Sequence, residues 1–197
     1  RPHDAAARAA KSGVEVISEI EIAMRAAPAA RIVAITGTNG KSTTTALIGH
    51  CLRDAGIAVA VGGNIGDAAC NLDDPGADGV IVLELSSYQL ETTPSLRADI
   101  AILLNITPDH LVRHGGMEGY VAAKGRILAA AGTSGLVIAG SEDTHVRALA
   151  DAHGKAGGTI VTVSATDAPA GAKAVPALAG AHNAANAAVA AACLRHL

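Results

Sequence analysis

Glycines, a lysine and hydroxyl side chains stand together between an apolar run and a helix-forming run of this sequence. The stretch is Gly37-Thr38-Asn39-Gly40-Lys41-Ser42-Thr43, and it follows the β-branched run 32–35. Glycine backbone adopts conformations that a Cβ would block, so successive N–H groups can point at one anion. A helix that starts at Lys41 adds its free N–H groups and its positive dipole end. Because Lys41 can reach phosphate oxygens and Ser42 can bind Mg²⁺, residues 37–43 predict a phosphate-binding loop for a nucleotide.

This loop departs from the general P-loop pattern at one position, where Ile35 replaces the first glycine. The alternative is an ordinary glycine turn between a strand and a helix. Gly-Lys-Ser-Thr directly after a buried strand favours the phosphate site over that alternative.

A carboxylate, Glu84, ends the apolar run 80–83. A charge is unstable inside a sheet core without a partner, so the end of a strand suits a carboxylate that binds a hard cation. The alternative is a solvent-facing loop residue. Beside a phosphate-binding loop, a Mg²⁺ ligand is the favoured interpretation.

When only spacing is considered, five further polar residues have an ordinary structural interpretation, and for four of them a functional interpretation is also open. His110 follows a strand in Pro-Asp-His and is either a loop residue or a ligand, a role that His114 could also take. Lys124 reads as a solvated lysine on a helix. Asn183 and Asn186 share one face of a helix start, where two amides could bind adenine or Asn183 could cap the helix.

An alternation of strands and helices from Arg31 onward must position these side chains. The apolar runs are continuous, which is typical of strands buried on both faces of a mainly parallel sheet. We therefore predict an α/β fold of three layers, with helices on both faces of the sheet and P-loop connectivity. Ligands of such sheets bind beyond the carboxyl ends of the strands, where the polar clusters fall. The predicted strands are 32–35, 57–61, 80–83, 100–104, 136–139 and 159–163, and the main predicted helices are 42–54, 117–131 and 142–153.

Two segments lie outside this alternation. Residues 1–30 are predicted to be a lead-in from a missing N-terminal domain, with short helices at 5–10 and 18–27. Residues 31–197 are predicted to form one nucleotide-binding domain. Within it, the Ala/Gly/Pro-rich stretch 165–180 predicts a linker, a mobile loop or a shortened hairpin.

Composition argues against several classes of partner. Half of the 197 residues are apolar, which is enough for a core, but the sequence has no Phe or Trp and two Tyr. A net charge of −3 and the scarcity of aromatic rings argue against nucleic acid. The three cysteines, with no metal spacing, are expected to be small buried residues in a reducing compartment. Without a signal peptide or a run of membrane-spanning length, we expect a cytoplasmic protein without membrane contact.

The order of these clusters resembles the central ATP-binding domain of the Mur ligases, which build peptidoglycan. The resemblance covers residues 13–197 and is carried by the stretches 36–43, 63–66, 84–91, 105–110 and 180–186. Glu-Leu-Ser-Ser-Tyr-Gln-Leu-Glu and Gly-Gly-Asn-Ile-Gly are most similar to the branch that joins D-glutamate to UDP-N-acetylmuramoyl-L-alanine. The resemblance implies a uridine-nucleotide domain before this chain and a C-terminal domain for the amino acid, both absent here.

The resemblance also implies roles for individual residues, with Lys41, Glu84, His110 and Lys124 as the catalytic set. Residues 37–43 would hold the phosphates of ATP, and Ser42 and Glu84 would bind one Mg²⁺. His110 would bind a second Mg²⁺ together with Lys124, which would be carbamylated. Asn64 and Ser86 would contact the muramoyl substrate, and Asn183 and Asn186 would contact the adenine. The implied reaction activates a carboxylate as an acyl phosphate before amide formation. We expect a monomer that binds ATP and Mg²⁺ and forms no amide as this fragment alone.

Two residues depart from the family pattern. Val112 stands where the family has Asp in Leu-Asp-Arg-His, which is expected to loosen the loop of His110, and Gly125 replaces the alanine after Lys124. The stretch 165–180 is also shorter than the family's hairpins. Two alternatives remain: the core of another Mur ligase or a folylpolyglutamate-synthase-like ligase, or a non-catalytic ATP-binding module.

Overall fold

A six-stranded sheet forms the centre of the computed structural model, which describes residues 2–197; Arg1, the first residue of the predicted lead-in, lies outside the described residues. The strand order is β2-β3-β1-β4-β5-β6, and each neighbouring pair is parallel. The predicted α/β fold is confirmed. The strands are β1 (Arg31–Thr36), β2 (Val59–Gly63), β3 (Val80–Glu84), β4 (Ile100–Leu103), β5 (Leu136–Gly140) and β6 (Thr159–Val163).

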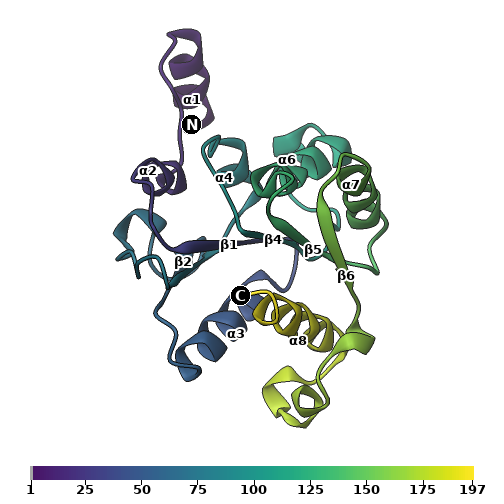
Figure 1. The fold of residues 1–197 in the computed structure, drawn as a ribbon. Helices are drawn as coiled ribbons and strands as arrows, with labels where there is room; N and C mark the ends of the chain where they lie inside the picture. Colours follow the sequence, from purple (N-terminus) through teal and green to yellow (C-terminus); the bar gives the residue numbers. More distant parts are fainter. Residues whose placement is uncertain (1) are drawn as a thin grey trace.

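Helices cover both faces of the sheet and complete the three layers. Figure 1 shows α2, α4, α6 and α7 on one face and α3 and α8 on the other, with α1 apart from the sheet. The helices are α1 (Pro2–Lys11), α2 (Glu19–Arg25), α3 (Lys41–Asp54), α4 (Ser87–Glu91), α5 (Leu111–His114), α6 (Met117–Ala131), α7 (Thr144–Lys155) and α8 (Ala181–Leu194).

Alternate residues of each strand enter two separate cores, which explains the continuous apolar runs. In β1, Ile32 and Ala34 pack in the core under α2, α6 and α7, whereas Val33 and Ile35 pack in the core under α3 and α8. Both faces of the strand are therefore buried, as expected for a parallel sheet. Alanines dominate the buried side of α8, where small side chains let the helix approach the sheet closely.

The sheet has one point where the direction of strand addition reverses. After β1 the chain places β2 and β3 on one side of it, and then β4, β5 and β6 on the other. Loops after β1 and after its neighbours β3 and β4 therefore meet at the carboxyl edge. Open α/β sheets bind their ligands at such a switch point.

Several local expectations were wrong. The short helices α4 and α5 were not predicted, and the stretch 165–180 contains three 3₁₀ turns (Ala165–Asp167, Ala170–Ala174 and Pro176–Leu178) and no strand, which excludes the shortened hairpin. The expectation of buried cysteines holds for Cys193, but Cys51 is half-buried and Cys70 is exposed. Within residues 2–197, no helix has the length and apolar character needed to cross a bilayer.

Gly125 lies inside α6, where alanine normally stabilises a helix. A Cβ at this position would lie 3.2 Å from the Cδ2 atom of Leu149, the end of a flexible, half-buried side chain of α7. We expect Gly125→Ala to raise the free energy of unfolding by about 0.5 kcal/mol, because the helix propensity gained exceeds the cost of moving Leu149 slightly.

Thermal unfolding followed by circular dichroism checks this expectation. Gly119→Ala, in the same helix, is the matched contrast: its Cβ would collide with the rigid carbonyl oxygen of His114, so this variant should be less stable. A loss of stability in Gly125→Ala comparable to that of Gly119→Ala would show that the contact between α6 and α7 requires glycine.

Candidate nucleotide and metal site

The predicted phosphate-binding loop connects β1 to α3 at the switch point of the sheet. Gly40 is the N-cap residue of α3 and has a φ of +84°, a conformation that side chains disfavour. A Cβ at Gly40 would also collide with the side-chain amide of Asn186. Glycine is therefore required here both for the turn and for the close approach of α8.

The loop after β4 holds the phosphate-binding loop in shape. The N–H of Thr38 donates to the backbone oxygen of Asn105 (2.9 Å), and the N–H of Asn39 donates to the Asn105 side chain (2.8 Å). The Asn105 amide donates back to the Asn39 carbonyl (3.0 Å), and the Thr107 N–H donates to the Thr38 hydroxyl (3.0 Å). These loop N–H groups are therefore already bonded within the protein. The N–H groups in the first turn of α3 have no acceptor inside the helix, so they can donate to an anion.

Glu84 lies at the end of β3, 2% exposed, and faces the start of α3. The Ser42 hydroxyl donates to one carboxylate oxygen (2.8 Å), and the Asn64 side-chain amide donates to the other (2.9 Å). Among the basic side chains that the structure describes, none forms an ion pair with Glu84. A buried carboxylate balanced by neutral donors alone favours a cation beside it.

The donor set around Glu84 fits Mg²⁺. Mg²⁺ is typically held by one or two carboxylates, with phosphate oxygens and water completing the shell. Within the described part of the chain, no three His, Cys, Asp or Glu side chains gather as a metal cluster. Glu84 and Ser42 are the protein ligands that this geometry offers.

Lys124 is buried, so its interpretation as a solvated lysine was wrong. Its side chain, on α6, is 2% exposed, and the Nζ atom donates to the Gly37 carbonyl (2.7 Å) and lies 4.9 Å from the centre of the Tyr120 ring. Burial, and then the charge of Lys41, lower the pKa of Lys124 to about 7, against the opposing effect of Asp109. Near neutral pH a large share of this amine is therefore unprotonated and nucleophilic.

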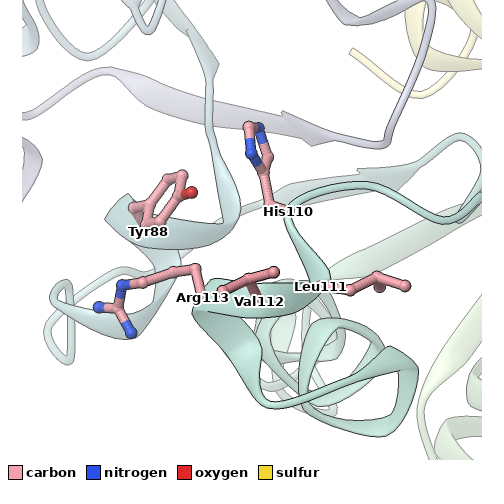
Figure 2. A pocket seen from close by; sticks show the side chains of 5 residues that line it. All are labelled: Tyr88, His110, Leu111, Val112 and Arg113. Carbon is pink, nitrogen blue, oxygen red and sulfur yellow. The ribbon is translucent and has the colours of Figure 1, made fainter.

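His110 is the N-cap residue of α5 and has a left-handed conformation, with a φ of +50°. Its half-exposed ring lies 3.4 Å from the Asp109 carboxylate and meets the edge of the Tyr88 ring at a centroid distance of 5.4 Å. Tyr88 and His110 line a cavity of about 660 Å³ together with Leu111, Val112 and Arg113. Figure 2 shows Tyr88 on a different segment from the other lining residues. No hydrogen bond or ion pair within residues 2–197 joins His110 to Glu84 or Lys124.

His114 does not compete with His110 for a ligand role. Its side chain is fully buried, one ring nitrogen lies 3.0 Å from the Ser87 hydroxyl, and the other lies 3.2 Å from the Glu91 carboxylate. It thus joins α5 to α4. Val112 is fully exposed, and the backbone bond from Arg113 to His110 is present, so the valine leaves the turn intact.

Asn183 and Asn186 lie beside the phosphate-binding loop. They line a cavity of about 590 Å³ that also includes residues of the phosphate-binding loop and of the loops after β4, β5 and β6. The Asn186 amide is almost buried and donates to the Asn183 side chain (3.4 Å). Gly180 is the N-cap residue of α8, so the alternative of Asn183 as the helix cap was wrong.

The structure joins most predicted site residues into three contacting sets. Ser42, Asn64 and Glu84 form one, Gly37 and Lys124 a second, and Gly40, Asn183 and Asn186 a third. Ser86 is the N-cap residue of α4 and is separated from Glu84, the last residue of β3, by Leu85 alone. Sequence reasoning missed Asn105, although its place as a polar residue directly after an apolar run was a usable signal.

The sequence profile of the Mur ligase middle domain matches residues 35–175. Proteins named UDP-N-acetylmuramoylalanine–D-glutamate ligase are similar to this chain. The one from Paramagnetospirillum magneticum is 47% identical over 164 residues, which cover 83% of this chain and 36% of the relative. The one from a Caulobacter species is 53% identical over 149 residues, which cover 73% of this chain and 32% of the relative. The chain therefore spans about a third of the length of these curated relatives.

A solved structure supports the fold. The UDP-N-acetylmuramate:L-alanyl-γ-D-glutamyl-meso-diaminopimelate ligase from Neisseria meningitides has a TM-score of 0.69 at 17% identity, covering 98% of this chain and 70% of that one.

Proposed function

Because the chain belongs to the Mur ligase family, we propose that it is the ATP-binding catalytic core of a ligase that joins D-glutamate to UDP-N-acetylmuramoyl-L-alanine. Mur ligases use ATP, and the substrate assignment rests on the shared name of relatives that are 47% and 53% identical. The observation that carries the proposal is the buried Glu84 carboxylate, which the phosphate-binding loop meets through Ser42 at 2.8 Å.

The proposed domain plan places residues 31–197 as the central domain of a longer ligase. Residues 1–30 would lead in from a domain for the uridine nucleotide, and a further domain would bring the amino acid. In this plan the present chain binds ATP and forms no amide alone, and the ligase works as a cytoplasmic monomer.

The proposed reaction has two steps. The carboxylate of the muramoyl substrate attacks the γ-phosphorus of ATP, so that ADP leaves and an acyl phosphate forms. The amine of D-glutamate then attacks the acyl carbon, phosphate leaves, and the amine proton passes to solvent or a nearby base. The main barrier is the electrostatic repulsion between an anionic nucleophile and a polyanionic phosphate. Positive charge in the site and precise positioning of the reactants lower this barrier.

Each site residue has a part in this scheme. Mg²⁺ held by Ser42 and Glu84 would supply charge to the phosphate oxygens. Lys41 and the first turn of α3 bind the β- and γ-phosphates, while Asn64 and Ser86 orient the muramoyl substrate. Asn183 and Asn186 bind the adenine.

We propose that Lys124 carries a carbamate and, with His110, serves a second Mg²⁺. In carbamate formation the unprotonated amine attacks dissolved CO₂, a new N–C bond forms as one C–O π bond opens to a carboxylate, and the amine loses a proton to solvent. The lowered pKa of Lys124 provides the unprotonated amine near neutral pH. The added carboxylate would lie by the Gly37 carbonyl, next to the phosphate-binding loop. A non-catalytic ATP-binding module has no need for a buried lysine at this place.

Amide formation by the full-length ligase tests the proposed function. With UDP-N-acetylmuramoyl-L-alanine and ATP, we expect turnover with D-glutamate and none with L-lysine or meso-diaminopimelate. We also expect none when a folate replaces the muramoyl substrate as the source of the carboxylate and L-glutamate is the amine. Binding of ATP with neither release of ADP nor amide product would favour the non-catalytic alternative. Preference for another amino acid would assign the chain to another branch of the family.

A further inference from the structure

Glu19, the first residue of α2, joins two loops that are far apart in the sequence. Its Oε1 atom accepts a hydrogen bond from the Gln89 side chain of α4 (2.9 Å). Its Oε2 atom accepts one from the N–H of Ala69, in the 3₁₀ turn after β2 (2.9 Å). The carboxylate is half-buried, and both of its oxygens are therefore occupied by different segments.

The bond to Gln89 fixes the start of α4. The Oε1 atom of Gln89 accepts from both the N–H (2.9 Å) and the hydroxyl (2.8 Å) of Ser86. This bonding requires the Gln89 amide to face Ser86 with its oxygen and Glu19 with its nitrogen. Glu19 thus determines the orientation of the amide that holds Ser86.

The bond to Ala69 closes the loop that carries Asn64. At the other end of this loop, the N–H of Gly63 donates to the carbonyl of Asp67 (2.9 Å), and Asn64 bonds the Glu84 carboxylate. The loop is therefore held at Glu84 on one side and at Glu19 on the other. Asn64 and Ser86 stand on the two segments that Glu19 connects.

Glu19 stands on a helix that is itself anchored to the core. The neighbouring Ile20 is fully buried, and the carboxylate of Glu21, also fully buried, accepts from the N–H and hydroxyl of Ser95 (2.9 and 2.7 Å). Arg25 donates to the same carboxylate at 2.8 Å. The position of Glu19 is therefore set by the body of the domain and not by a loose segment.

We propose that Glu19 is a positioning residue that holds Asn64 and Ser86 at one fixed spacing for the muramoyl substrate, a role that rests on the proposed function. Glu19 itself touches no substrate and acts through Gln89 and the loop 64–69. No motif of the sequence contains it. The proposal predicts that breaking its bonds weakens binding of the muramoyl substrate and leaves ATP binding unchanged.

A reciprocal exchange of the side chains of Glu19 and Gln89 tests whether their hydrogen bond holds the two segments together. In Glu19→Gln, the new amide nitrogen faces a donor whichever way it turns, either the Ala69 N–H or the Gln89 amide. In Gln89→Glu, two carboxylates face each other at hydrogen-bond distance. In the double variant Glu19→Gln/Gln89→Glu, the new amide would accept from the Ala69 N–H and donate to the new carboxylate, which would accept from Ser86. Every donor then again has an acceptor.

Two readouts are measured in the full-length ligase: amide hydrogen exchange of peptides covering 64–69 and 86–89, and the KM values for both substrates. We expect faster exchange in both peptides of each single variant and a KM for UDP-N-acetylmuramoyl-L-alanine about tenfold higher, the effect of one mismatched pair of hydrogen-bonding groups. The KM for ATP should stay within about twofold, and the double variant should return both readouts close to those of the unmodified enzyme. Hydrogen exchange needs no turnover, so it tests the link through Glu19 independently of which substrates the ligase uses.

Glu15→Gln is the matched control, because Glu15 precedes the same helix, is exposed and pairs only with Arg25 in the described residues. The proposal is overturned if the single variants exchange no faster than this control, or if the double variant is no better than the single ones. A lower melting temperature with an unchanged KM for the muramoyl substrate would also overturn it, because Glu19 would then serve stability alone.

Discussion

Glu84→Gln is expected to lower ligase turnover by about 10²–10³-fold and to remove the effect of Mg²⁺ on the affinity for a non-hydrolysable ATP analogue. Glutamine has almost the same shape and still offers an oxygen to Asn64 or Ser42, so the fold should be preserved. Glutamine lacks the negative charge of the buried Glu84 carboxylate, and a hard cation at this site needs that charge. The loss should therefore fall on metal-dependent binding and not on stability.

Isothermal titration of the 197-residue chain with the analogue, with and without Mg²⁺, measures this effect. The unmodified chain should bind more tightly with Mg²⁺, and Glu84→Gln should bind equally in both conditions. Glu118→Gln removes an exposed carboxylate from the first turn of α6 and should behave like the unmodified chain. If Glu84→Gln still responds to Mg²⁺, the cation is held elsewhere.

Lys124→Met is expected to remove a large part of the pH dependence of stability. The pKa of Lys124 is about 7 in the folded protein, below its ordinary value of 10.5. Between these two values the unfolded chain binds a proton that the folded chain lacks, so stability rises with pH across this window and is lost as the pH falls towards 7. For a group this deeply buried, the gain from pH 7 to pH 9 is about 2–3 kcal/mol.

Urea unfolding at pH 7, 8 and 9 measures this slope. The difference in unfolding free energy between the unmodified chain and Lys124→Met should grow with pH in favour of the unmodified chain, because the contributions of all other groups cancel. Lys155→Met, which changes an exposed lysine at the end of α7, should keep the unmodified slope. Parallel pH profiles for the unmodified chain and Lys124→Met would mean that Lys124 stays protonated in the folded protein.

The sheet and the phosphate-binding loop were predictable because their signals are local. Continuous apolar runs identified all six strands to within two residues at each end, since burial on both faces requires such runs. Gly40, Lys41 and Ser42 could be placed because the loop chemistry needs those residue types in that order. Glu84 followed from its position at the end of a strand.

Other features depended on contacts between distant segments. The burial of Lys124 arises because α6 packs across the loop of Gly37, 87 residues away, and helix spacing does not reveal this. Glu19 was missed for the same reason: its partners are 50 and 70 residues away. Asn183 lies inside α8 because Gly180, three residues earlier, is the N-cap residue, and the interpretation from spacing considered only Asn183 for that position.

A crystal structure of the chain with Mg²⁺ and a non-hydrolysable ATP analogue tests the central claim most directly. The account predicts a metal ion bound to Ser42 and Glu84, phosphates on the loop 37–43 and the base against Asn183 and Asn186. A nucleotide bound at another edge of the sheet, or phosphates on this loop with no cation at Glu84, would contradict it.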